Sequence, residues 1–454
     1  MLKRVYAAVS AASIVLSAAG AATAQEVHLV HLEYGKNAEV KGIAPYGSAF
    51  LRPQAERPAG DWKLPSFAGA EPLFCMAKLG DSEYLIVLDA SGGGEHYDRA
   101  WLDRNGDGNL SDEPALEGEV AVFEGGFYSV DFEDTVDVEY ELDGARLPYC
   151  LGLRVSGNDM RELMENLPEG GLEGVVGGRW HVYANLTTGC CYSGRFELDG
   201  RDYLVRLADS DCDGRFGEPA AELEGLVYGS DTIYAPGDHV YLTGGEKLTS
   251  EDLLLMGDRL MVGQRLFDVA VDVAGAKLTL TPRTEDLLPL ALSHAPERLV
   301  AHTRGFEHTV MMVAPGDVAR LPAGDYRLFS YSMLKTGERG DVWRVAAGGS
   351  ERSPYVTLDG GGDDRLEFGE PFAAFAELPR WFGDMPRGDD GKEVQLGFHV
   401  KGCGQDHVTD LARVSGKESS CAMSTKEPRR PAEPSYFIVA ADGERVVQGD
   451  FKYG

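Results

Sequence analysis

Residues 267–280 read Phe-Asp-Val-Ala-Val-Asp-Val-Ala-Gly-Ala-Lys-Leu-Thr-Leu, and this stretch decides the fold class. Apolar side chains alternate with polar or small ones from Phe267 to Val273, and the alternation resumes at Leu278 after a turn at Gly275. A period of two residues is that of a strand with one buried face, so the stretch predicts a β-hairpin.

The same pattern recurs along the chain. It appears at residues 136–140, 180–184 and 326–331, and the 57 glycines and 22 prolines fit many short turns. One short helix is predicted from Asp159 to Leu167, with Asn158 as its N-cap. We therefore expect a mainly β fold, with several β-sandwich or β-rich units, inserted acidic loops and one short helix.

The N-terminus has the features of a cleaved signal peptide. Lys3 and Arg4 precede a short apolar run, and Ala22-Thr23-Ala24 provides the small residues before a cleavage site at Gln25. The apolar run is shorter than the roughly 20 residues of a membrane-spanning helix. The sequence therefore predicts a periplasmic or secreted protein without a membrane span.

The composition is strongly acidic. Removal of Lys3 and Arg4 with the signal takes the formal net charge from −31 to −33. Such a charge repels nucleic acid and anionic lipid and favours cations as partners, although an acidic surface also serves solubility alone. With 43% hydrophobic residues, the chain has enough apolar side chains for two to four domain cores.

Two acidic loops carry the candidate chemistry. The first runs from Asp103 to Glu113 and the second from Asp209 to Glu218. Each loop has oxygen-bearing side chains at positions 1, 3 and 5, and an apolar residue at position 8. Position 6 is Gly108 in the first and Gly214 in the second. Calcium takes six to eight oxygen ligands, and a glycine at position 6 permits the sharp bend that collects them.

These loops resemble the calcium loops of EF-hand and dockerin proteins over about a dozen residues each. The terminal acid comes one or two positions early, and Pro114 and Pro219 follow it, which disfavours the exiting helix of an EF-hand. The resemblance implies Ca²⁺ as cofactor, and the alternative is an acidic Asp-Gly turn without metal. The candidate ligands are Asp103, Asn105, Asp107, Asn109, Asp112, Glu113, Asp209, Asp211, Asp213, Arg215 through its carbonyl, and Glu218.

A larger repeat surrounds the loops. Glu113-Pro114 and Glu218-Pro219 each open a similar run, and a degenerate third copy follows residues 355–358. Its candidate metal residues are Asp359, Asp363 and Glu370. However, Gly361 stands where an oxygen ligand is expected, and Asp364 stands where the glycine is expected. This copy either binds a metal or only keeps the turn.

The final third has a different resemblance. Residues 310–315 and 319–328, with the strands that follow, resemble the transthyretin-like or immunoglobulin-like sandwiches of exported bacterial proteins. The whole chain resembles exported bacterial proteins that place aspartate-rich loops among β-repeats. The expected organisation is a signal peptide (1–24), a β-rich unit with the first loop (25–170), one with the second (171–290) and a sandwich with the third (291–454).

Seven cysteines lie in the expected oxidising compartment. Cys403 and Cys421, in one stretch between two strand-like runs, are the pair predicted to form a disulfide. The pairing of the other five stays open, and no spacing supports a zinc site.

No catalytic motif is present: the sequence lacks a Gly-x-Ser-x-Gly elbow, a His-Glu-x-x-His pair and a phosphate-binding glycine loop. We therefore expect an exported calcium-binding β-protein, non-enzymatic, in a structural or surface-binding role. The alternatives are a glycan-binding module and a glycan-active hydrolase, and a glycan or a protein at the cell surface is a possible partner.

Overall fold

The computed structural model describes most of the chain, with gaps. The described residues are 24–34, 36–37, 40, 47–69, 71–91, 96–123, 126–132, 135–160, 175–176, 180–220, 237–245, 248–249, 252–350, 352–361, 364–377, 397–416, 421–439 and 443–451. Within them the protein is mainly β, as predicted, and the helical element described over its whole length is a 3-10 turn, η4 (Arg304–Phe306). None of their helices has the length and apolarity needed to cross a membrane.

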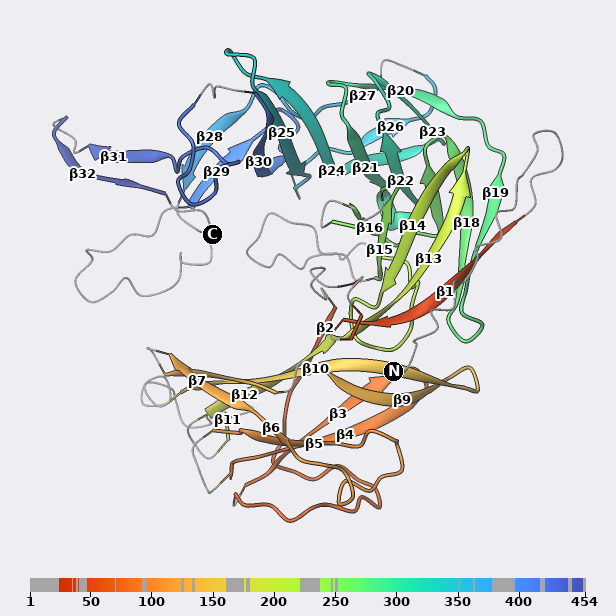
Figure 1. The fold of residues 1–454 in the computed structure, drawn as a ribbon, viewed down its shortest axis with the longest axis vertical. Helices are drawn as coiled ribbons and strands as arrows, with labels where there is room; N and C mark the ends of the chain where they lie inside the picture. The colour runs from red at the N-terminus through yellow and green to blue at the C-terminus, as the bar shows by residue number, and fades with distance from the viewer. Residues whose placement is uncertain are drawn as a thin grey trace, which may run out of the picture.

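Two sheets build the lower body in Figure 1. The four-stranded sheet has the order β3-β4-β5-β6, namely β3 (Leu73–Leu79), β4 (Ser82–Asp89), β5 (Arg99–Leu102) and β6 (Leu116–Glu117). The seven-stranded sheet comprises β2 (Ser48–Leu51), β7 (Glu119–Phe123), β8 (Phe127–Asp131), β9 (Val136–Leu142), β10 (Ala145–Asp159), β11 (Val175–Val176) and β12 (Trp180–Thr188). The apolar run of β4 is buried on both faces, because one face packs on this second sheet and the other on Trp101 and Leu110.

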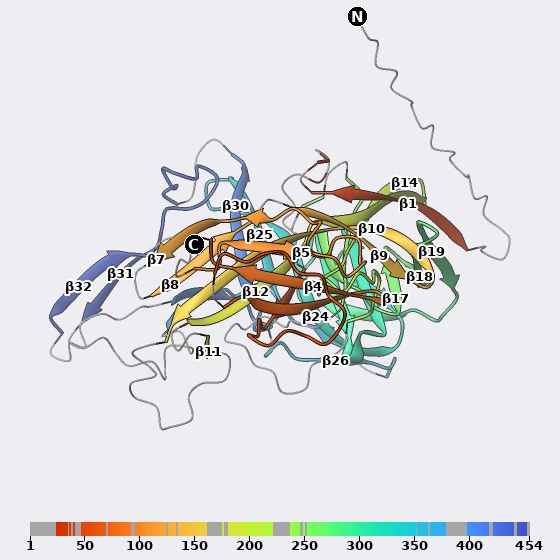
Figure 2. The same ribbon diagram turned by 90° about the horizontal axis from the view of Figure 1, so that it is seen from below.

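A sixteen-stranded sheet dominates the rest of the molecule (Figures 1 and 2). Its first nine strands, in order, are β16 (Leu253–Leu255), β15 (His239–Thr243), β14 (Arg201–Ala208), β13 (Cys190–Leu198), β1 (Gln25–Glu33), β19 (Lys277–Arg283), β18 (Arg265–Asp272), β17 (Arg259–Val262) and β22 (His308–Val313). The order continues with β21 (Arg298–Thr303), β24 (Gly324–Thr336), β25 (Val342–Gly348), β30 (His407–Ser415), β29 (Gly397–Lys401) and β28 (Ala373–Glu377), and β26 (Val356–Leu358) pairs with β24.

The sheet curls, because β16 at one end contacts β22, the ninth strand in the order. Side chains from both sides of the curl, including Val205, Val240 and Leu278, line a small apolar cavity inside it. The main core continues from this interior into the lower body.

Two small sheets complete the described fold. One has the order β23-β20-β27, with β20 (Leu288–Leu292), β23 (Val318–Leu321) and β27 (Arg365–Leu366), and its side chains share a second core with those of β21 and β24. Two sheets packed face to face in this way form a sandwich-like layer pair. The other is the hairpin of β31 (Ser435–Val439) and β32 (Arg445–Asp450).

The predicted hairpin is confirmed, with Val269 opposite Leu280 and Val271 opposite Leu278 across β18 and β19. The predicted helix is not observed in the described residues: Asn158 and Asp159 are the last residues of β10 and pair with His181 and Trp180. Asn158 therefore does not cap a helix, and residues 161–167 lie outside the described part.

Strand pairing also crosses the expected unit limits. β1, from the first expected unit, lies between β13 and β19 of the second. The limit at residue 290 falls inside β20, and residue 170 lies outside the described residues.

Candidate metal centre

Each acidic loop begins where a buried strand ends. Asp103 follows β5 and is 1% exposed, and Asp209 follows β14 and is 0% exposed. A buried carboxylate must be satisfied by hydrogen bonds or charges. Backbone N–H groups of the loop itself provide those hydrogen bonds.

The two loops share one hydrogen-bond pattern at position 6. The Gly108 N–H donates to Asp103 Oδ2 over 3.0 Å, and the Gly214 N–H donates to Asp209 Oδ2 over 2.7 Å. Both glycines have positive φ, 76° and 81°. A side chain at Gly214 would also come within 2.8 Å of the Tyr140 ring, so both the backbone conformation and the available space require glycine there.

The pattern repeats at position 5. Asp107 Oδ1 accepts from the Asn109 N–H over 2.8 Å, and Asp213 Oδ1 accepts from the Arg215 N–H over 2.7 Å. The apolar residue at position 8 is buried in both loops, as Leu110 and as Phe216. The sequence repeat is therefore also a structural repeat.

The two loops differ in where their acids point. In the first, Glu113 accepts from the Arg104 N–H over 3.1 Å and lies 3.7 Å from Arg104 Nε. Asn109 Nδ2 donates to Asp112 Oδ2 over 2.7 Å. These terminal side chains thus bond within the loop. Although every residue from 103 to 113 is described, the three acidic groups with metal-ligand spacing found in the described residues do not include this loop.

In the second loop the acids converge. Carboxylate oxygens of Asp211, Asp213 and Glu218 lie within 4.8 Å of one another, and so do those of Asp209, Asp211 and Asp238. Asp211 belongs to both groups. We call these five residues the loop-2 acid cluster, and four of them were candidates from the sequence.

Asp238 is the member that the sequence pattern missed. It is 2% exposed and lies just before β15, twenty residues beyond Glu218, the last residue of the loop. Its Oδ1 accepts from the Ser210 N–H over 3.0 Å, and its Oδ2 accepts from the Gly217 and Glu218 N–H groups over 2.6 and 2.9 Å. Asp238 therefore clamps both ends of the loop.

The cluster is electrostatically unfavourable when all its carboxylates are ionised. Burial raises the pKa of Asp238 to about 7, and the charge of Asp211 adds to the rise. Burial likewise raises the pKa of Asp213 to about 6, with contributions from Asp211 and Glu218. The pKa of Asp209 also rises, through burial first and then the charge of Asp238. A divalent cation would relieve this repulsion.

The one basic side chain of the loop, that of Arg215, forms its ion pair outside the cluster. Arg215 points to another element, with its Nη2 2.9 Å from Asp81 Oδ1 in the turn between β3 and β4. Its backbone N–H donates within the loop, to Asp213 Oδ1. Arg215 can therefore contribute a carbonyl to an ion, and its charge, although paired with Asp81, still lowers the pKa of Asp213 in part.

The loop is also held by the lower body. The Gly80 N–H donates to Asp213 O over 2.5 Å, and the Tyr140 hydroxyl donates to Gly214 O over 2.6 Å. The buried Tyr149 hydroxyl donates to Asp209 Oδ2 over 2.7 Å. The second loop thus lies at a junction between the lower body and the large sheet.

The third candidate loop is not assembled in this way. Asp359 is exposed, and its Oδ1 accepts from the Gly361 N–H over 2.8 Å, while Glu370 pairs with Lys335 Nζ at 2.9 Å. Asp363 lies outside the described residues. The two described candidates are therefore engaged in a turn and an ion pair.

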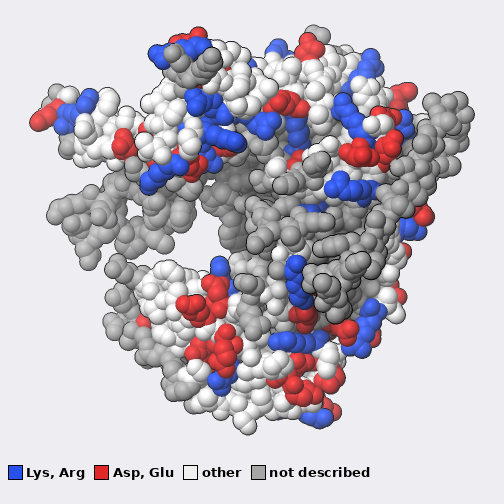
Figure 3. Space-filling view, viewed as in Figure 1, with Lys and Arg blue, Asp and Glu red and all other residues white. Residues whose placement is uncertain are grey.

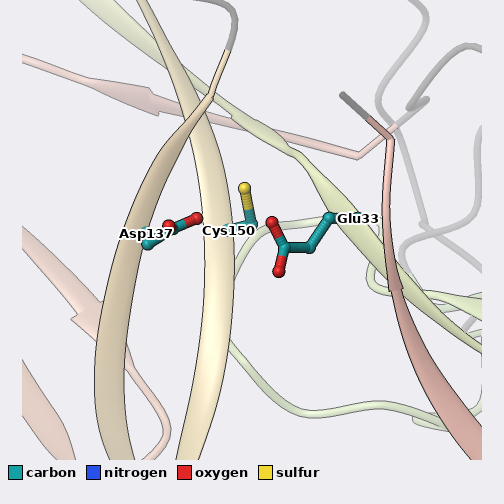
Figure 4. Close-up of side chains that lie close together, drawn as sticks. All are labelled: Glu33, Asp137 and Cys150. Atoms are coloured by element: carbon teal, nitrogen blue, oxygen red, sulfur yellow. The ribbon is translucent and has the colours of Figure 1, made fainter. Parts of the chain in front are cut away.

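A third acidic group lies elsewhere, at Glu33, Asp137 and Cys150 from β1, β9 and β10 (Figure 4). The ammonium of Lys36 lies 2.6 Å from Glu33 Oε2 and 2.8 Å from Asp137 Oδ2. Because Lys36 pairs with both carboxylates, a metal ion would relieve less charge repulsion in this group than in the loop-2 acid cluster. Figure 3 shows several groups of acidic side chains on the lower body in the same view as Figure 1.

The predicted disulfide between Cys403 and Cys421 is not formed, and the structure contains no disulfide among its described residues, which include all seven cysteines. Cys403 lies in the turn before β30, whose nine residues span about 30 Å at the usual rise per residue. The segment that follows Cys421 lies beside the other end of β30, where the Arg413 N–H donates to Arg429 O. The strand between the two cysteines therefore separates them, and the remaining five cysteines are buried.

Comparisons of the chain with family models, with curated proteins and with solved structures found no match. The functional argument therefore rests on the geometry of the acidic loops.

Proposed function

We propose that this chain is an exported calcium-binding protein and that its second acidic loop takes a calcium ion in a structural role. One observation carries the proposal: the five carboxylates form two groups that share Asp211, with oxygens within 4.8 Å of one another in each group. The arginine of the loop, Arg215, pairs with Asp81.

Within the cluster, Asp211, Asp213 and Glu218 are the best ligands for the ion. Asp209 and Asp238 are nearly fully buried, and their oxygens already accept several backbone hydrogen bonds. Asp211 and Glu218 are exposed, and neither accepts a hydrogen bond at its carboxylate from the described residues. We infer that the first three residues bind the ion and that the two buried aspartates hold the loop.

The donor set favours calcium over other metals. It consists of carboxylate oxygens, with the Arg215 carbonyl at position 7, and hard oxygen donors suit calcium or magnesium. Zinc sites in proteins mostly use histidine or cysteine, and Cys212 instead lies 3.0 Å from the Thr188 hydroxyl. Flexible carboxylates on an irregular loop suit the larger ion, because magnesium demands near-octahedral geometry.

The first loop remains a predicted second calcium site. Binding there requires Glu113 to leave Arg104 and Asn109 to leave Asp112. We therefore propose that it is the weaker site.

Calorimetric titration of the chelator-treated protein tests the proposal. Calcium should bind with a dissociation constant of about 10⁻⁴ to 10⁻³ M and raise the melting temperature. Asp213→Ala should abolish the response of the second loop, and Asp317→Ala, at an exposed aspartate without an ion pair among the described residues, is the matched control. No heat and no change in melting temperature at millimolar calcium would reject the calcium site.

Export is tested separately. Mass spectrometry of the protein from its native source should find Gln25 as the first residue. Protein that retains residues 1–24 would contradict export through signal cleavage while leaving the calcium site untouched.

A further inference from the structure

A large groove lies on the curled sheet, away from the acidic loops. It has a volume of 1320 Å³ and lies where the start of β14 and the end of β15 approach the start of β21 and the end of β22. This volume exceeds the roughly 300–1,000 Å³ of most small-molecule sites. The groove therefore has room for an extended ligand.

The charge of the groove is opposite to that of the chain. Four arginines and three acids line it, whereas the whole chain has a net charge of −31. Arg344 pairs with Glu297 at 3.0 Å, and Asp252 accepts from the Thr249 N–H and hydroxyl. These contacts engage two of the three acids within the groove wall.

Two of the arginines are available to a ligand. Arg195 and Arg201 are exposed, and neither forms an ion pair within the described part of the chain. A guanidinium group binds a carboxylate or sulfate in two parallel hydrogen bonds. The register of β13, β14 and β15 places Arg195 opposite Leu204 and Leu204 opposite Thr243, so the Thr243 hydroxyl lies on the same face as Arg195. Arg201, the first residue of β14, starts from the other face, and both arginines line the groove.

The backbone of the groove wall disfavours an extended peptide. Strands β14, β15, β21 and β22 each have a neighbour on both sides in the sheet. No free edge is therefore available among these strands for a peptide to add as a further strand. Recognition must come from arginine side chains and hydroxyls such as those of Thr243 and Ser332.

We propose that this groove binds an acidic oligosaccharide, with Arg195 and Arg201 on its carboxylate or sulfate groups. The hydroxyl-bearing side chains hydrogen-bond the sugar hydroxyls, and Val313, which is 46% exposed, offers an apolar surface to the sugar ring. This site is independent of the calcium loops.

The test is calorimetric titration at fixed free calcium with three probes: a sulfated heparin tetrasaccharide, a galacturonate trisaccharide and a neutral glucose oligosaccharide. At least one acidic probe should bind while the neutral one does not, and the affinity should fall with salt. Comparison of the two acidic probes distinguishes sulfate from carboxylate as the preferred group.

Arg195→Ala/Arg201→Ala should weaken binding about tenfold or more, since two charge-assisted contacts are lost. Arg320→Ala, at an exposed arginine on β23 without an ion pair among the described residues, should leave the affinity unchanged. Because Arg201 is exposed, the charge reversal Arg201→Glu provides a second variant that should keep the fold, checked by its unfolding midpoint.

The proposal is overturned if neither acidic saccharide binds, or if the double variant binds as the wild type does. Tighter binding of a glutamate hexapeptide than of both saccharides would assign the groove to an acidic peptide instead. Binding that is lost in Asp211→Asn but kept in the arginine variants would move the saccharide to the acidic loop and also overturn the proposal.

Discussion

The substitution Asp211→Asn tests whether Asp211 binds the ion or only supports the structure of the loop. Asp211 is exposed and belongs to both groups of the loop-2 acid cluster. Its backbone N–H, which donates to Asp209 Oδ1 over 3.2 Å, is unchanged by the substitution. Asparagine keeps the shape of the side chain and removes only its charge, so the fold should survive.

The effect of this change should reverse sign with calcium. Without the ion, the charge of Asp211 raises the pKa of Asp209, Asp213 and Asp238, which means that it opposes their ionisation. Two unit charges about 4 Å apart interact by ~1 kcal/mol in a water-like dielectric. At neutral pH in chelator, Asp211→Asn should therefore raise the free energy of unfolding by up to about 1 kcal/mol.

With calcium, the wild type should gain more than the variant. An ion at about 100 times its dissociation constant stabilises a protein by ~2.7 kcal/mol. Loss of one carboxylate ligand should weaken binding about tenfold, so the variant gains ~1.4 kcal/mol less from the same calcium. In calcium, the free energy of unfolding of the variant should then equal that of the wild type or lie below it.

Urea unfolding at neutral pH, with chelator or with millimolar calcium, measures both free energies. Asp317→Asn replaces an exposed aspartate that forms no ion pair in the described residues. This control should change the free energy of unfolding by the same amount in chelator and in calcium. Equal effects of Asp211→Asn in chelator and in calcium would refute the assignment of Asp211 as a ligand.

Three further outcomes follow from the contacts. Arg215→Ala should keep the calcium-induced rise in melting temperature, because the backbone carbonyl remains; loss of that rise would show that the side chain is needed. Tyr149→Phe removes the hydroxyl that donates to buried Asp209, so the free energy of unfolding should fall by about 1–3 kcal/mol in urea titrations, and an unchanged value would contradict the contact. Burial, with the charges of Asp406 and Glu367, raises the pKa of Cys403, so peptide-level mass spectrometry should find slower alkylation at neutral pH than for glutathione, with a rate that still climbs as the pH rises.

Strand positions were predictable because a strand is recognised by a local period of two. The stretches at β9, β12, β18 and β24 each alternate in sequence, and each lies in a sheet. The predicted helix was wrong in its first residue, Asp159, because apolar spacing over a few residues does not exclude a preceding strand that extends to that residue. Sheet order was not predictable, since β1 lies between β13 and β19, far away in the chain.

Asp238 could not be found by loop spacing for the same reason. In the antiparallel pair of β14 and β15, Ala208 lies opposite His239, so the residues just outside this pair, Asp209 and Asp238, become neighbours. Nothing local marks Asp238 in the sequence. Its role depends on which strand follows β14 in the sheet, and that requires the whole fold.

The third loop keeps part of the turn's hydrogen bonding, although its described carboxylates do not form a group suited to an ion. Phe-Gly-Glu-Pro occurs at residues 216–219 and again at 368–371, and in both copies the glycine N–H donates to a buried distant aspartate, Asp238 or Asp406. Asp406 also accepts from a tyrosine hydroxyl, that of Tyr331, over 2.6 Å. The third copy therefore keeps the glycine contact of the clamp, although Glu370 pairs there with Lys335.

Because the clamp is made of hydrogen bonds from the chain itself, the turn should fold without calcium. Ion binding then depends on the carboxylates that the turn presents, which converge at Asp211, Asp213 and Glu218. Calcium should accordingly add stability to a folded loop at the junction with the lower body, where Gly80 and Tyr140 bond to the loop backbone. Removal of the ion should loosen this junction first, before the cores on either side of it.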